Sequence, residues 1–121
     1  ILLTNCLFSQ TVTVSTFIGS TEGYVDEALF DGPEQMAFDD QGNLFLADRW
    51  NNVIRKISPE GTVTTIVDDF VCSGLAVDAE GDLFASQGFS NKIWEFNLNG
   101  DSEVYAGASR GSIRGDQDGS L

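Results

Sequence analysis

Histidine is missing from all 121 residues of this chain. Because histidine is the commonest general base near neutral pH and a common zinc ligand, its absence weighs against acid–base catalysis and against a zinc site. Basic residues are also scarce, since 6 Lys and Arg face 19 Asp and Glu and give a formal net charge of −13. This charge repels phosphate backbones, and the chain has no basic cluster to hold nucleic acid or an anionic lipid surface.

Cysteines and long apolar runs are scarce as well. Cys6 and Cys72 lie too far apart for a CxxC metal knuckle and are too few for a disulfide framework, so we expect both to be unpaired or processed. The chain has no stretch of 18 or more apolar residues of the kind that spans a bilayer. We therefore expect no nucleic-acid partner, no membrane insertion, no metal site and no cofactor.

The first ten residues allow two interpretations. Ile1–Phe8, followed by Ser9 and Gln10, resembles the end of a secretory signal peptide, although an initiator Met and a basic n-region are missing. An ordinary buried strand is the alternative. The first interpretation predicts an extracellular, periplasmic or cell-envelope location.

An internal repeat is the most informative feature of the sequence. The ten residues that begin at Met36 recur from Leu75, a shift of 39 positions. The register continues without a gap through turn glycines, apolar positions and an asparagine. Matched pairs include Asp39 with Asp78, Gly42 with Gly81, Asn52 with Asn91, Ile54 with Ile93 and Gly61 with Gly100. This agreement indicates that one supersecondary unit is used twice.

Each copy is expected to form four short strands. The Asp-x-x-Gly segments 39–42 and 78–81 predict tight hairpins, because Asp accepts local backbone hydrogen bonds and Gly adopts positive φ without strain. The expected strands are 35–39, 43–47, 53–58 and 62–67 in the first copy, and 74–78, 82–86, 92–97 and 103–106 in the second. A four-stranded antiparallel unit with a period of about 40 residues is typical of a β-propeller blade.

The predicted fold class is therefore all-β, a β-propeller fragment of about two four-stranded antiparallel blades. Blade 1 is expected over 34–67 and blade 2 over 73–107. Residues 1–10 are the candidate end of a truncated signal peptide, 11–19 a separate outer strand of a closing blade, and 108–121 the start of the connection to a next blade. Since two blades leave uncovered end faces, we expect the isolated fragment to self-associate or to be marginally stable.

The motifs Gly42–Asp48 and Asn51–Ile57 resemble the NHL-repeat family, whose blades carry a Gly-Asn-aromatic-Val-Ala-Asp strand and an Asn-His-Leu-like turn into an Ile-Arg-Lys-Ile strand. The second copy is more degenerate and has Gln87 in the place of Asp48. The resemblance implies a six-bladed, TolB-like propeller. Members of such a family serve as ligand-binding modules and protein-interaction platforms, and a few are lyases or lactonases, so the fold alone does not decide the function.

The resemblance also places ligand binding at the loops between the second and third strands and between blades. There we expect the binding residues Asp48, Arg49, Trp50, Gln87 and Phe89. Exposed aromatic side chains with polar neighbours are frequent recognition anchors. The alternative is that Trp50 and Phe89 pack between adjacent blades. We expect Trp94, on a third strand, in the core or at a blade interface.

No catalytic residue is predicted. The acidic segments 39–43 and 116–119 lack the alternating ligands and distant Glu of an EF-hand, and a hairpin turn explains the first of them. No pair of nucleophile and general base can be assigned, because the sequence offers no base. The sequence therefore predicts non-catalytic binding of a protein or glycan by a secreted or cell-envelope protein. The alternative is the partial blade set of a secreted lactonase or lyase whose catalytic residues lie in other blades.

Overall fold

The computed structural model describes residues 29–97 and 99–107. Regular structure within these residues consists of β-strands. They are β1 (Pro33–Phe38), β2 (Leu44–Asp48), β3 (Val53–Ile57), β4 (Val63–Val67), β5 (Gly74–Val77), β6 (Leu83–Gln87), β7 (Lys92–Phe96) and β8 (Ser102–Ala106). Each strand begins and ends within two residues of the bounds expected from the sequence.

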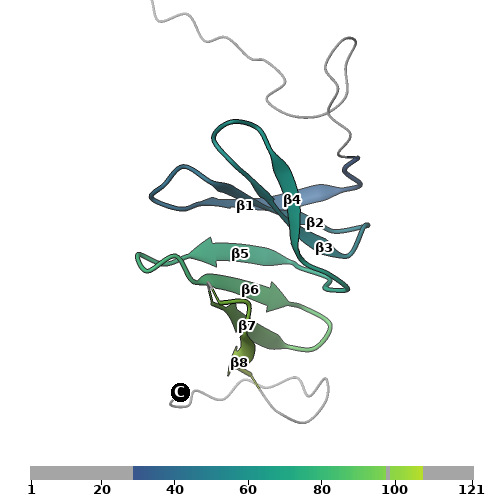
Figure 1. The fold of residues 1–121 in the computed structure, drawn as a ribbon. Helices are drawn as coiled ribbons and strands as arrows, with labels where there is room; N and C mark the ends of the chain where they lie inside the picture. Colours follow the sequence, from purple (N-terminus) through teal and green to yellow (C-terminus); the bar gives the residue numbers. More distant parts are fainter. Residues whose placement is uncertain (1–28, 98, 108–121) are drawn as a thin grey trace, which may run out of the picture.

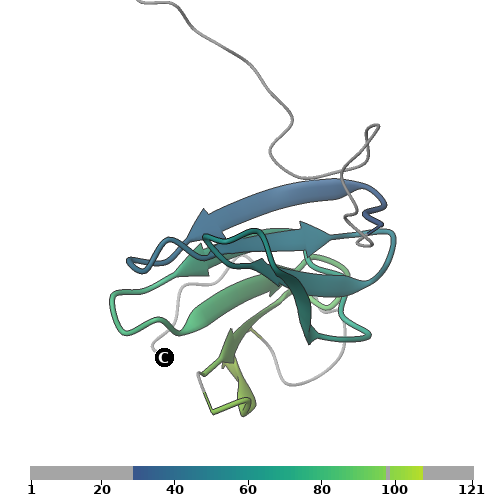
Figure 2. The ribbon, with the colours of Figure 1, turned by 45° about the horizontal axis from the view of Figure 1, so that its top comes forward.

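The strands form two antiparallel four-stranded sheets. Their orders are β1-β2-β3-β4, here called blade 1, and β5-β6-β7-β8, here called blade 2. Figure 1 shows the two sheets one above the other, with β5 of blade 2 beside β1 and β2 of blade 1. In Figure 2 the strands of blade 1 lie over those of blade 2. The chain therefore repeats one meander twice and stacks the two copies.

Asp39 shows why the first hairpin turns where it does. Its Oδ1 accepts hydrogen bonds from the backbone N–H groups of Gln41 at 3.0 Å and Asn43 at 2.7 Å, and its Oδ2 accepts one from Asn43 Nδ2 at 2.6 Å. Gly42 closes the turn with a φ of 83°, which a residue with a Cβ rarely adopts. Asp78 accepts equivalent backbone hydrogen bonds in the β5–β6 hairpin. These hairpins confirm the turns predicted from the repeat.

The main hydrophobic core lies between the two blades. Strand alternation turns Phe45 and Ala47 toward blade 2, while Leu44 and Leu46 face the other side of blade 1. Buried members of the core are Phe45, Ala47, Ile54, Phe70, Cys72, Leu83 and Ala85. Phe70, from the β4–β5 connection, stands edge-on to Trp94 and Phe96, with ring centroids 6.4 and 5.3 Å away. Trp94 thus packs at the blade interface, as predicted.

Several predictions concern residues that the structure does not describe. The candidate signal-peptide end (1–10), the outer strand (11–19), the connection (108–121) and the acidic segment 116–119 lie outside the described residues. Self-association of the chain stays a prediction. Across residues 29–97 and 99–107, no helix is long and apolar enough to cross a membrane.

Candidate functional site

The connections between strands gather at two opposite ends of the blades. In Figure 1 the β1–β2 and β5–β6 turns lie on the left, and the β2–β3, β4–β5 and β6–β7 connections lie on the right. We call the right-hand end the loop face; it comprises residues 29–32, 49–52, 68–73 and 88–91. The sequence-predicted site residues lie in or beside these segments.

Trp50 is an exposed side chain on the loop face that is still held in place. It is 67% exposed, and its backbone N–H donates to the carbonyl of Asp31 at 3.0 Å. The indole lies directly against Gly32, where an added Cβ would overlap its Cδ1 atom. Gly32 also has a φ of 62°, so both space and backbone conformation require glycine there. The indole is thus held in position against Gly32 and remains exposed to solvent.

Arg49 borders the indole of Trp50. Its guanidinium lies 5.5 Å from the ring centroid, within the range of a cation–π contact. The same guanidinium donates from Nη1 to Glu34 Oε1 at 2.7 Å. An ion pair with half-exposed partners adds little to stability, but it restricts where the guanidinium can lie. Arg49 and Trp50 therefore form a polar and aromatic pair open to solvent.

Asp48 lies in the interior beneath this pair. Its side chain is fully buried, and its Oδ1 accepts a hydrogen bond from the backbone N–H of Asp31 at 2.8 Å. Its Oδ2 accepts hydrogen bonds from Asn51 Nδ2 at 2.8 Å and Arg55 Nε at 3.2 Å. The carboxylate therefore ties the segment before β1 to the β2–β3 loop. It acts on Trp50 through Asp31, whose carbonyl accepts the Trp50 N–H, and is itself not exposed at the surface.

The fold can be compared with solved structures. The virginiamycin B lyase of Staphylococcus aureus is 22% identical, with a TM-score of 0.55, over 61% of this chain and 26% of that chain. A streptogramin B lyase is 19% identical, with a TM-score of 0.58, over 65% and 28%. A gluconolactonase of Xanthomonas campestris is 22% identical, with a TM-score of 0.60, over 65% and 27%. All are β-propeller proteins.

The two sheets are blades of a β-propeller. The fold-class prediction is thereby confirmed. This chain spans roughly a quarter of the length of the propellers it matches. Comparison with family models and with curated proteins found no match.

In the second propeller blade, the loop face is built differently. Gln87 occupies the position of Asp48, is half-buried, and accepts a hydrogen bond from the Ser90 hydroxyl at 2.8 Å. Phe89 occupies the position of Trp50 and is 64% exposed. Both aromatic side chains are thus open to solvent in the structure, and neither is buried between blades 1 and 2. The two blades present one aromatic group each at equivalent positions.

The residues that build the Trp50 support were missed by sequence reasoning. Asp31, Gly32 and Glu34 precede or begin β1, and Asn51 and Arg55 follow Asp48 by three and seven positions. A usable signal existed for Arg55, because the β2–β3 hairpin sets it opposite Leu46, two positions from Asp48 along β2. The contacts made by Asp31 and Gly32 cannot be predicted from local sequence. Both residues precede β1, whereas their partners Asp48 and Trp50 lie at or after the end of β2.

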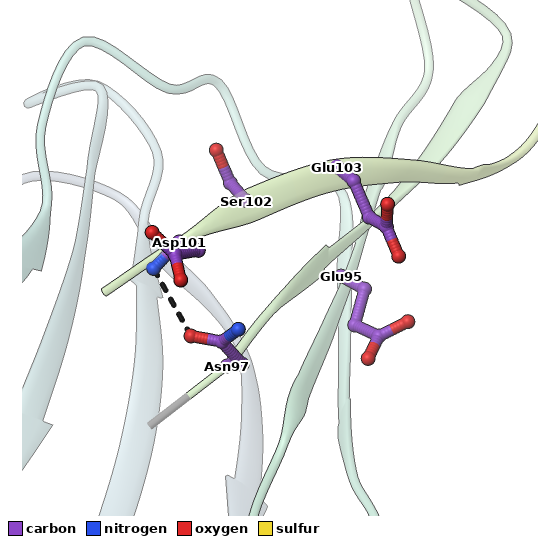
Figure 3. Close-up of a pocket in the computed structure, with 5 residues that line it drawn as sticks. All are labelled: Glu95, Asn97, Asp101, Ser102 and Glu103. Atoms are coloured by element: carbon purple, nitrogen blue, oxygen red, sulfur yellow. Dashed lines mark hydrogen bonds between the residues drawn. The ribbon is translucent and has the colours of Figure 1, made fainter. Parts of the chain in front are cut away.

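A separate polar pocket of about 280 Å³ lies at the β7–β8 hairpin (Figure 3) and is lined by Glu95, Asn97, Asp101, Ser102 and Glu103. Asn97 Oδ1 accepts the backbone N–H of Asp101 at 3.0 Å, while Glu95 and Glu103 are directly opposite in the strand register. Partial desolvation raises the pKa of Glu95, and neighbouring carboxylates raise it further. Among the described side chains, no three His, Cys, Asp or Glu are grouped so that they could hold a metal ion.

Proposed function

We propose that the loop face is a non-catalytic binding surface for a protein or glycan, carried by a secreted or cell-envelope NHL-repeat propeller of six blades. The position of Trp50 is the main support for this proposal. An aromatic side chain that is exposed and already fixed offers a large contact area and loses little conformational entropy when a ligand binds. Gly32 and Arg49 provide that fixation.

Phe89 supplies a second aromatic surface at the equivalent position of the next blade. Arg49, half-exposed beside the indole, adds hydrogen-bond donors at the rim of the surface. Asp48 and Gln87 act in this proposal as supporting residues, because their side chains bond within their own blades. The NHL-like motifs support the family, and the apolar segment Ile1–Phe8 supports secretion.

The proposal is tested by probing glycan arrays and extracellular-protein arrays with the labelled chain and two variants. Trp50→Ala is expected to lower the signal of the strongest ligand about tenfold or more, as truncation of a central aromatic contact does. Phe38→Ala is the matched control, because Phe38 is equally exposed, at 65%, but lies on β1 next to the hairpin turn. Equal signals from Trp50→Ala and the unmodified chain would contradict the proposal.

The structural comparisons favour a second candidate, the partial blade set of a propeller enzyme. The similar propellers include two lyases and a gluconolactonase. A histidine-to-alanine variant of the Staphylococcus aureus lyase is catalytically inactive, whereas this chain has no histidine. A lyase of that kind would thus take its histidine from outside these 121 residues. Opening of gluconolactone or of a streptogramin B antibiotic, above the buffer rate, by a longer protein that contains this chain and further blades would favour the enzyme.

A further inference from the structure

A groove of about 290 Å³ opens between the two blades, on the side of the blade 2 hairpin turns. Side chains of both blades form its walls, and most of them are apolar. The lining residues are Phe45, Lys56, Ile66 and Val67 of blade 1 and Gly81, Leu83, Phe96, Asn97 and Gly100 of blade 2. Lys56 is the one charged residue among them. The groove is thus an apolar slot with a single cation.

The ammonium group of Lys56 is available for a ligand. Its Nζ lies 5.7 Å from the centroid of the Phe45 ring, which also lines the groove. Within the described part of the chain, the ion pairs join Arg49 to Glu34 and Arg55 to Asp48, and neither involves Lys56. The charge of Lys56 acts on Asp39, whose carboxylate oxygens already accept three hydrogen bonds inside their own turn.

The repeat shows that the blade architecture does not require a cation at this position. Lys56 is paired across the strands with Phe45, and the equivalent pair in blade 2 is Glu95 with Phe84. Blade 2 therefore keeps an aromatic partner but carries a negative charge where blade 1 carries a positive one. A lysine at this place is therefore a property of this groove and not of the repeated blade.

We propose that the groove binds a small aliphatic carboxylate, with its alkyl chain against Phe45, Leu83 and Phe96 and its carboxylate group at Lys56. The cavity volume of about 290 Å³ lies just below the range of about 300–1,000 Å³ that is usual for ligand pockets, so the ligand is small. The Lys56 ammonium, the one charge that lines the groove, favours an anion there and acts against the long-range repulsion from the net charge of −13. This site is separate from the loop face and independent of its function.

The test uses octanoate as the probe, 1-octanol as its neutral counterpart, and ligand-observed saturation-transfer NMR on the full chain. Octanoate is expected to bind saturably. Lys56→Gln is expected to weaken octanoate binding about threefold to fivefold, as loss of a partly exposed ion pair does, and to leave octanol binding unchanged. Lys92→Gln is the matched control, since Lys92 is the other lysine of the chain and lies over Trp94, away from the groove.

A third variant, Ile66→Trp, fills the groove from β4 and is expected to abolish binding of both probes. Ile66 is 41% exposed, so the larger side chain does not disturb the buried core; circular dichroism checks the fold. The proposal is overturned if octanoate gives no saturable signal. It is also overturned if Lys92→Gln weakens binding as much as Lys56→Gln, or if Ile66→Trp leaves octanoate binding intact.

Discussion

Arg55 donates a hydrogen bond from Nε to the fully buried carboxylate of Asp48 at 3.2 Å. The same carboxylate also holds the backbone of Asp31 and the side chain of Asn51. One side chain therefore joins β3, the β2–β3 loop and the segment that leads into β1. Loss of its charge leaves donors from three segments without an ionic acceptor.

We predict that Asp48→Asn lowers the free energy of unfolding by about 2 kcal/mol. The loss is smaller than for a fully buried ion pair, because the Arg55 side chain is 21% exposed and can recover some hydration. Urea unfolding followed by circular dichroism measures the change. Asp40→Asn, which changes an exposed carboxylate of the β1–β2 turn, is the control and is expected to shift stability by less than about 0.5 kcal/mol. Equal losses in the two variants would disprove this role.

Trp94 occupies in blade 2 the position of Arg55, and its Nε1 is buried with no hydrogen-bond partner among the described residues. Trp94→Phe removes the unpaired donor and keeps an aromatic ring beside Phe70, so we predict a stability within about 1 kcal/mol of the unmodified chain. Trp94→Ala leaves a void beside Phe70 and is predicted to cost about 2–3 kcal/mol. Similar losses in both variants, in the same urea assay, would mean that Nε1 does have a partner.

Cys72 is a buried free thiol with low reactivity. Burial raises its pKa to about 11, and its Sγ lies 3.2 Å from the carbonyl oxygen of Gly74 as a hydrogen-bond donor. Because the thiolate is the reactive form, we predict that a disulfide reagent at about pH 8 labels Cys72 far more slowly in buffer than in concentrated urea. The measurement uses the Cys6→Ser chain, so that one thiol is present. Equal rates in the two solvents would show that Cys72 is accessible in the folded state.

Glu95 is predicted to make the folded chain more stable as the pH falls toward the acidic range. Desolvation raises its pKa above the usual value of 4.5, and the charges of Asp82, Glu103 and Asp78 raise it further. The folded state therefore takes up this proton before the unfolded state does. The unfavourable effect of the Glu95 charge is present at neutral pH, falls as the pH drops through the raised pKa, and is gone below 4.5.

Carbon-13 NMR titration of the Glu95 carboxyl tests this prediction directly. Glu103→Gln removes the carboxylate opposite Glu95 and is expected to move the pKa of Glu95 part of the way back toward its usual range. Glu80→Gln removes an exposed carboxylate of the β5–β6 turn that is not among the causes of the shift, and it serves as the control. An unchanged Glu95 titration in Glu103→Gln would rule out the cross-strand repulsion.

The fold was predictable because its determinants are local and occur twice. Asp39 and Asp78 are each followed three positions later by a glycine, and the carboxylate and the positive φ together close a hairpin without help from distant residues. The shared 39-residue register then sets the remaining strands. Phe70 and Cys72 were not foreseen as core residues, because they lie in a connection and are buried only when the second blade stacks on the first.

The site was predictable only in part. Trp50 and Phe89 are at the exposed end of the blade as expected, since the β2–β3 and β6–β7 loops follow directly from the strand pattern. Asp48 was expected among the binding residues of the loop face, because the family resemblance places ligand binding there. Its burial depends on Arg55, which β2–β3 pairing brings beside it, and on Asp31, which the β1–β2 hairpin brings beside it. The groove at Lys56 arises from the packing of two blades, so no local pattern could reveal it.

Hydroxyl-radical footprinting of the chain, with and without its strongest array ligand, tests most directly whether the loop face is the binding surface. Trp50, Phe89 and Phe38 are similarly exposed in the free chain, so each can be compared with itself in the presence of the ligand. We predict that the ligand lowers the oxidation of Trp50 and Phe89 about threefold or more and leaves Phe38 unchanged. Protection of Phe38 with full oxidation of Trp50 would contradict a binding surface at the loop face.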